Sequence, residues 1–170
     1  MRELHDVIEA LFDEDDGSCR ELTFQGSSWD GVAIAVEKLA RGSRTEAAHD
    51  EEGLEISRPF GDSVAQFSTS TRPVSMYFIF ESEACIVKRV RLFVSKDDDG
   101  SPYVEITFFP EEVDRSSDVK QRFVGWSDEL QVTLRAQRYY ARYENASWRV
   151  GDVGPTSGVF LVSNDLRDGA

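Results

Sequence analysis

The spacing of apolar residues changes along the chain and separates helical stretches from extended ones. Residues 2–12 carry apolar side chains at helical intervals, which predicts an amphipathic helix. The same spacing predicts helices over 28–40, where one of two adjacent serines can cap the first turn, and over 118–137. Gly125 is expected to bend or split the last of these helices.

The middle of the chain alternates apolar and polar residues, which is the period of a strand with one buried face. The strongest alternation lies over 74–80, 85–94 and 103–109, and these runs are rich in β-branched and aromatic residues. Short polar connections join them, so an antiparallel meander is predicted, with the Asp-rich segment 97–101 as an exposed hairpin turn. Weaker strand signals fall at 19–25, 54–56, 64–68, 139–144 and 159–162.

No repeat and no linker-like change of composition interrupts these elements. The prediction is therefore an α+β fold in a single domain over 1–170, with an antiparallel sheet packed by the helices near 2–12, 28–40 and 118–137. Two polar stretches lack apolar periodicity. Residues 43–53 are predicted to form a solvated loop, and residues 164–170 a frayed tail.

Charge and composition narrow the class of protein. The 170 residues include 19 Lys and Arg against 32 Asp and Glu, a net charge of −13. Two Cys and two His exclude a disulfide scaffold and leave little material for a zinc site. No apolar run approaches the ~20 residues of a membrane helix, and the acidic opening residues differ from an export signal. A cytoplasmic protein without a membrane segment is predicted.

The Asp-rich turns are the first candidates for chemistry, and neither predicts a catalytic or metal site. Asp97 and Asp99 superficially match the nucleophile loop of haloacid-dehalogenase-type phosphatases, but a strand follows them where that family has a helix. Counted as a calcium loop from Asp13 or Asp97, the twelfth residue is a phenylalanine instead of the bidentate glutamate. Both segments are interpreted as turns, and no metal or cofactor is predicted.

Nucleophilic residues are similarly isolated. The serines at 27–28 miss the nucleophile-elbow spacing by one residue. His5 and His49 have no neighbours that suggest a catalytic triad, and His49 is placed in the polar loop. Cys19 and Cys85 lie in or beside strands, where inert thiols are expected. The sequence predicts no catalytic residue and favours a protein that is not an enzyme.

The basic and aromatic residues at 138–143 resemble a surface that stacks on single-stranded nucleic acid. A net charge of −13 opposes this interpretation, because the long-range field repels phosphates. A strand whose arginines balance nearby carboxylates is the preferred interpretation, and no nucleic-acid partner is predicted.

The chain resembles the bacterial immunity proteins of polymorphic-toxin and secretion systems. The features behind this resemblance are the acidic opening helix with LFDEDDGS at 11–18, the strand Arg20 to Gln25 after it, and a single α+β domain without catalytic motifs. The resemblance implies a bacterial protein that neutralises a basic toxin domain, including a nuclease, by protein–protein binding. No interface residue can be carried over from that class by a motif.

The physical argument for an interface rests on charge and one aromatic residue. A negative field steers a cationic partner and speeds encounter, while a desolvated aromatic side chain supplies affinity. Trp29 is the predicted anchor, and the predicted steering carboxylates are Asp13, Glu14, Asp15 and Asp16. The alternatives are an interaction module with another partner, a small-molecule sensor, and an enzyme whose site is assembled from distant carboxylates. A buried cleft of convergent carboxylates with raised pKa values would favour the enzyme.

Overall fold

The computed structural model describes residues 4–12, 17–72, 75–144 and 158–164. In chain order, the elements are α1 (Leu4–Phe12), β1 (Arg20–Gln25), α2 (Trp29–Arg41), β2 (Arg44–Asp50), α3 (Phe60–Thr69), β3 (Ser75–Glu81), β4 (Arg89–Lys96), β5 (Pro102–Phe108), the 3-10 helix η1 (Pro110–Glu112), α4 (Val119–Leu134), β6 (Arg138–Tyr143) and β7 (Val159–Val162).

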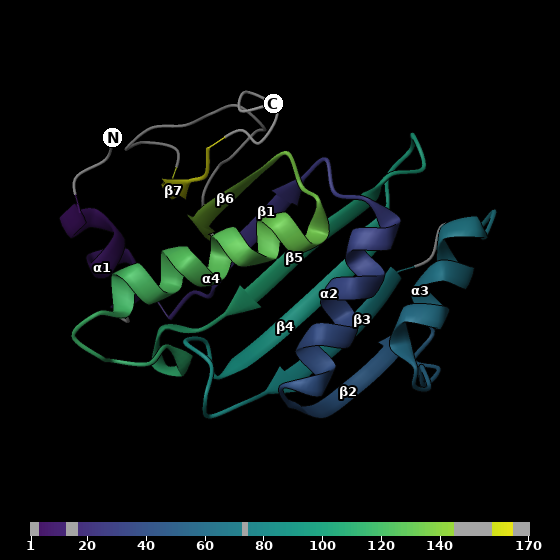
Figure 1. The fold of residues 1–170 in the computed structure, drawn as a ribbon, viewed down its shortest axis with the longest axis horizontal. Coiled ribbons are helices and arrows are strands. Elements are labelled where there is room, and N and C mark those ends of the chain that lie inside the picture. Colours follow the sequence, from purple (N-terminus) through teal and green to yellow (C-terminus); the bar gives the residue numbers. More distant parts are fainter. Residues whose placement is uncertain (1–3, 13–16, 73–74, 145–157, 165–170) are drawn as a thin grey trace.

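The strands form one seven-stranded sheet in the order β2-β3-β4-β5-β1-β6-β7, and every neighbouring pair is antiparallel. β1 comes first in the sequence but lies inside the sheet, between β5 and β6. Figure 1 shows the α-helices in front of the sheet, so they cover one of its two faces. This arrangement confirms the predicted α+β class and the predicted antiparallel meander, which is β3-β4-β5.

The helix-covered face holds the hydrophobic core. Alternate residues of β3, β4 and β5 are buried there, as strand geometry requires. β4 begins at Arg89, later than predicted, because Ile86 and Val87 are adjacent and both buried, which breaks the alternation. Val87 instead forms an isolated bridge with Val113.

α2 is held at its first turn by a cap and by a close contact with α4. The Ser28 Oγ accepts a hydrogen bond from the Gly31 N–H at 3.1 Å, which confirms serine capping of this helix. Ser28 N–H donates to the Leu134 carbonyl at 3.0 Å. A Cβ built on Gly31 would lie 2.3 Å from that same carbonyl oxygen, so α2 and α4 meet backbone to backbone here.

α4 runs from Val119 to Leu134 without interruption, so the prediction that Gly125 splits this helix is wrong. Nothing lies within 4 Å of a Cβ built on Gly125, and glycine there leaves the backbone free to continue as a helix. The helix ends at Leu134, and the next residue, Arg135, caps it with a left-handed φ of 54°.

Two segments form a different type of secondary structure from the one predicted. Residues 44–50, predicted as part of a solvated loop, form the edge strand β2. An edge strand is little buried, so its polar residues show no apolar alternation. The strand predicted at 64–68 is instead helix α3, whose buried Phe60, Val64 and Phe67 follow helical spacing. Residues 54–56 contribute only an isolated bridge from Glu55 to His49.

α1 is fastened to the sheet by a buried cation. Arg20 of β1 is fully buried, and its Nε donates to the Ala10 carbonyl in the last turn of α1 at 2.6 Å. Its Nη1 donates to the Ser18 carbonyl and hydroxyl at 2.9 and 3.0 Å. The guanidinium also lies 4.2 Å from the ring centroid of Tyr143. Arg20 therefore satisfies the Ala10 carbonyl, one of those that the last turn of α1 leaves without a partner in the helix.

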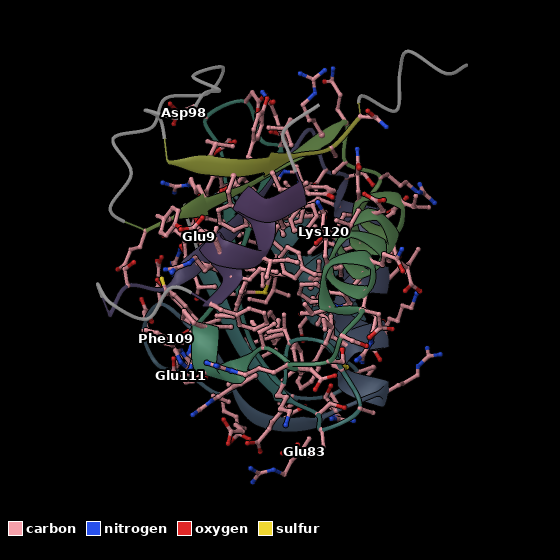
Figure 2. The ribbon with its side chains drawn as sticks, turned by 90° about the vertical axis from the view of Figure 1, so that its left-hand side faces the viewer. Glu9, Glu83, Asp98, Phe109, Glu111 and Lys120 are labelled. Atoms are coloured by element: carbon pink, nitrogen blue, oxygen red, sulfur yellow. The ribbon has the colours of Figure 1, made fainter. Side chains whose placement is uncertain are left out.

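Figure 2 shows Asp98 and Glu83 at opposite ends of the molecule, with exposed carboxylates such as Glu9 and Glu111 between them. Among the described residues, no helix is long and apolar enough to cross a membrane. The predicted frayed tail lies outside the described residues, apart from Asn164.

Candidate functional site

Trp29, the predicted anchor, lies at the first residue of α2 and joins that helix to the β4–β5 turn. Its Nε1 donates to the Gly100 carbonyl at 2.9 Å. Its ring packs on Phe67 at 5.7 Å between centroids, and the Lys96 Nζ lies 5.8 Å from the ring. The side chain is half-buried, so much of its surface already serves a contact within the protein. The predicted partners of Trp29, Asp13 to Asp16, lie outside the described residues.

The structure instead places a different acidic segment beside Trp29. Asp97, Asp98 and Asp99 form the exposed β4–β5 turn, closed by a hydrogen bond from the Gly100 N–H to the Asp97 carbonyl at 2.8 Å. Gly100 has a φ of 83°, as expected for glycine in this turn. The interpretation of this segment as a turn is confirmed. Hydrogen bonds from Ser101 to Asp99 lower the pKa of that carboxyl.

A second acidic turn follows β2. The Asp50 Oδ1 accepts hydrogen bonds from the Glu52 and Leu54 N–H groups at 3.0 and 2.9 Å. Glu51 and Glu52 are exposed, as is Leu54, which has 61% of its surface accessible. Because β2 and β4 both run toward this end of the sheet, antiparallel to β3 between them, the two acidic turns lie at the same end.

The sheet face opposite the helices, called here the open face, carries a row of rings. His49, Tyr77 and Phe93 lie directly across from one another on β2, β3 and β4. The centroids are 5.4 Å apart for His49 and Tyr77, and 4.9 Å for Tyr77 and Phe93. Tyr103 of β5 continues the contact, 6.1 Å from Phe93. Glu105 lies directly across from Phe93, so the row ends at a carboxylate.

His49 was predicted to lie in a polar loop, and this is wrong because residues 44–50 are a strand. Its Nδ1 lies 2.9 Å from the Asp50 carbonyl oxygen, and its ring stacks on Tyr77 with 25° between the planes. His49 is therefore an aromatic member of the open face.

Ion pairs involving β4 and β6 lie beside the ring row on the open face. Arg91 donates from Nη1 and Nη2 to the two oxygens of Glu112, each at 2.7 Å. Arg142 forms an ion pair with Glu21 and approaches Glu105 at 3.6 Å. Tyr103 donates its hydroxyl hydrogen to Glu105. Each of these arginines is already engaged by carboxylates of the protein itself.

Among the carboxyl groups of the described residues, Glu21 has the pKa that this arrangement shifts most. Burial, followed by the nearby Glu105 carboxylate, raises the pKa of Glu21 from 4.5 to about 7, against the lowering effect of Arg142. Burial also raises the pKa of the Cys19 thiol to about 12, which agrees with the predicted inert cysteine. The raised pKa of Glu21 therefore lies near neutral pH.

This pKa gives a pH-dependent stability. A carboxyl whose pKa is higher in the folded protein than in the unfolded chain stabilises the fold below its unfolded pKa, and that stabilisation is lost as pH rises through the folded pKa. Between pH 5 and pH 8, the free energy of unfolding of the natural protein is expected to fall by about 2 kcal/mol relative to the Glu21→Gln variant. Urea denaturation at each pH measures the difference. A constant difference between the two proteins across this range would contradict the assignment.

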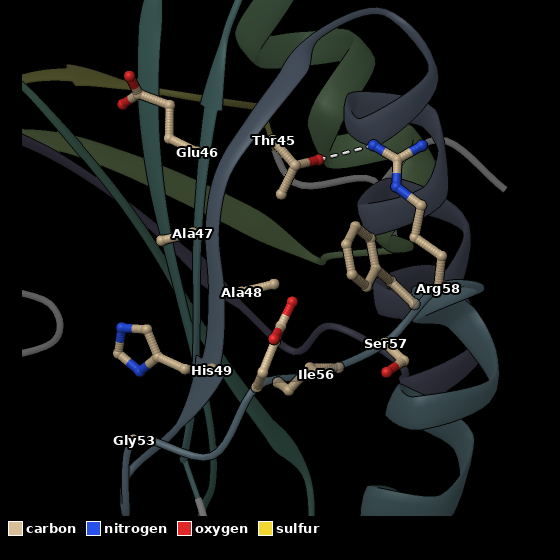
Figure 3. Close-up of a pocket in the computed structure, with 11 residues that line it drawn as sticks. Thr45, Glu46, Ala47, Ala48, His49, Gly53, Ile56, Ser57 and Arg58 are labelled. Atoms are coloured by element: carbon tan, nitrogen blue, oxygen red, sulfur yellow. Dashed lines mark hydrogen bonds between the residues drawn. The ribbon is translucent and has the colours of Figure 1, made fainter.

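Two hollows adjoin these features. One, of about 470 Å³, lies on the open face and is lined by residues that include Tyr77, Phe93, Arg91 and Glu105. The other, of about 570 Å³, lies at the outer edge of β2 (Figure 3). In Figure 3, Glu46 and His49 point to one side of the strand, while Thr45 and Arg58 meet on the other. The polar groups that line the hollow at β2 therefore point to both sides of the strand and do not converge on one point.

Among the described residues, no group of three or more His, Cys, Asp or Glu side chains is positioned to hold a metal ion. The open face instead carries partly exposed rings beside a carboxylate, which suits contact with a cationic or aromatic group.

No protein-family model matches the sequence, and no curated protein sequence matches it. A search of solved structures finds a chain of the 1.75 Å crystal structure of the toxic C-terminal tip of CdiA from Pseudomonas aeruginosa in complex with immune protein. The match has a TM-score of 0.61 and covers 87% of this chain and 96% of that chain, at 14% sequence identity. The fold is that of a chain from a toxin–immunity complex. The predicted resemblance to this class is confirmed at the level of the fold.

The resemblance was anticipated from the acidic opening helix, the strand after it and a single α+β domain without catalytic motifs, but the open face was not. Its rings come from strands that are distant in the sequence. The available signal was that Tyr77, Phe93 and Tyr103 occupy positions between the buried ones, where a half-covered strand usually carries polar residues.

Proposed function

We propose that this chain is a non-enzymatic immunity-type protein that binds and neutralises a basic toxin domain in the bacterial cytoplasm. The observation that carries the proposal is the fold match with a chain of a toxin–immunity complex, which spans nearly the whole of both chains. The net charge of −13 supports a cationic partner, because opposite charge steers encounter. A nuclease is one such partner, since its nucleic-acid cleft is basic.

Affinity purification of the tagged chain from the native host tests whether a basic protein partner exists. We expect one basic protein to stay bound to the tagged chain through washing at physiological salt, and its gene to lie near the gene of this chain. Recovery of no protein partner would count against the proposal.

Charge reversal tests the steering role proposed for Asp13, Glu14, Asp15 and Asp16. Replacing all four with lysine is expected to lower the association rate constant about tenfold at low salt, with a smaller change in dissociation. Raising the salt concentration should shrink the difference, because screening weakens interactions between exposed charges. Stopped-flow mixing with the purified partner measures both rates.

A control variant carries the same change in net charge at scattered exposed positions, namely Glu9, Glu83, Glu111 and Glu129. It is expected to slow association less than reversal of the 13–16 segment. Equal slowing in the two variants would show that net charge alone acts and would remove the special role of that segment.

A specific observation supports one second candidate, an enzyme with a carboxylate-based site. The pKa of Glu21 is about 7, and Glu105 lies close enough to contribute to that shift. Against this candidate, Glu21 is not among the residues that line the open-face hollow, and its side chain is only 11% exposed beside Arg142. A Glu21→Gln variant that keeps toxin neutralisation favours the binding protein, and one that binds normally without neutralising favours the enzyme.

A further inference from the structure

The ring row on the open face, His49, Tyr77, Phe93 and Tyr103, is partly accessible to solvent, with Tyr77 exposed and the other three rings half-buried. Tyr77 is 40% exposed, although it lies on an inner strand of the sheet. Among the described residues, the α-helices pack on the opposite face (Figure 1), so the ring row is free of helical cover. Large aromatic side chains on the solvent side of a sheet are typical of binding surfaces, where they provide rigid contact area.

The charges around the ring row indicate the chemistry of its occupant. Arg91 is committed to Glu112 by two hydrogen bonds, and Arg142 is committed to Glu21 and Glu105. The turns at 50–55 and 97–99, which follow β2 and β4 at the same end of the sheet, add further acidic residues and contain no basic residue. The charges on the strands are largely paired, including Arg89 with Glu46, so the carboxylates of the two turns give this end of the open face its excess negative charge.

Phe93 and Glu105 provide the most specific position for such a cation. They are cross-strand neighbours on β4 and β5, and both line the hollow of about 470 Å³. A guanidinium or ammonium group placed over the rings gains attraction from their π faces. Glu105 lines the same hollow beside Phe93, so a cation over the rings lies near a carboxylate whose present partners are the Tyr103 hydroxyl and Arg142.

We propose that the open face, centred on Tyr77, Phe93 and Glu105, is the docking surface for the basic toxin partner and receives an arginine or lysine side chain of that partner. This inference rests on the proposed function and adds the surface and the chemistry of its occupant. The helix-covered side and the Trp29 corner are then outside the centre of the interface.

The test uses the full chain and, as probe, the purified product of the neighbouring reading frame, inactivated in its toxic site. Tyr77→Lys places a like charge in the docking position without disturbing the core, and it is expected to weaken binding about a hundredfold. Tyr77→Phe keeps the ring and is expected to bind within about threefold of the natural chain. Phe93→Ala is expected to weaken binding about tenfold, with thermal melting checked for each variant.

Val132→Lys on α4 is the matched control, because Val132 is 63% exposed on the helix side. It is expected to bind within about threefold of the natural chain, since rim or remote charges change affinity little. If the natural chain binds the probe and Tyr77→Lys binds equally well, the docking surface is wrong while the proposed function stands. The docking surface would also be wrong if Trp29→Ala or Val132→Lys abolished binding while the Tyr77 and Phe93 variants still bound the probe. If the natural chain itself binds nothing, both the proposed function and this inference fail.

Discussion

Replacing Gly31 with alanine is expected to lower the free energy of unfolding by about 3 kcal/mol, because the added methyl group has no room. It would lie 2.3 Å from the Leu134 carbonyl oxygen and 2.5 Å from its carbonyl carbon, both of which are backbone atoms. The same oxygen accepts the hydrogen bond from Ser28 N–H, so moving α4 away also weakens the junction of the two helices.

Gly125→Ala is the matched control in the other helix. Nothing lies within 4 Å of its added Cβ, and alanine is favoured over glycine in a helix interior by about 1 kcal/mol. This variant is therefore expected to be more stable than the natural protein. Chemical denaturation measures the free energy of unfolding of both variants. Similar values for Gly31→Ala and Gly125→Ala would contradict the close contact between α2 and α4.

Replacing Arg20 with methionine is expected to cost about 3 kcal/mol and to loosen α1 first. Methionine fills much of the space but leaves the Ala10 and Ser18 carbonyls without the donor that the guanidinium provides. Arg20→Lys should be intermediate, because one ammonium cannot reproduce the spread of guanidinium hydrogen bonds. Arg72→Met, at an exposed position, is the control and should be nearly neutral.

Hydrogen exchange gives a readout that is specific to this role of Arg20. In the Arg20→Met variant, amides of α1 should lose protection well before those of β3 and β4, because α1 has few other contacts with the sheet. Uniform loss of protection across the molecule would show that Arg20 supports the core as a whole and does not act through α1.

The central sheet could be predicted from the sequence because each strand of the meander alternates strongly on its own. β2 could not, since an edge strand needs few apolar residues, and its one-residue bulge between Thr45 and Ala47 disturbs the period. α3 was misassigned from Val64, Gln66 and Ser68, which alternate, while the helical repeat of Phe60, Val64 and Phe67 carries the true signal.

The candidate site was less accessible to sequence reasoning. Trp29 could be selected as an aromatic residue near the acidic segment 13–16, but its hydrogen bond to the Gly100 carbonyl depends on a turn far along the chain. Glu21 and Glu105 are brought together only by the pairing of β1 with β5, in which Thr23 lies opposite Glu105. Spacing within one segment cannot reveal such contacts, because they arise from strand order.

The most direct measurement of the central claim is survival of cells that express the toxin-like product of the neighbouring reading frame. Co-expression of this chain is expected to restore growth, and a tagged copy should co-purify with that product from the surviving cells. Restored growth without complex formation, or no protection at all by well-folded protein, would contradict the account of this chain as an immunity-type binding protein.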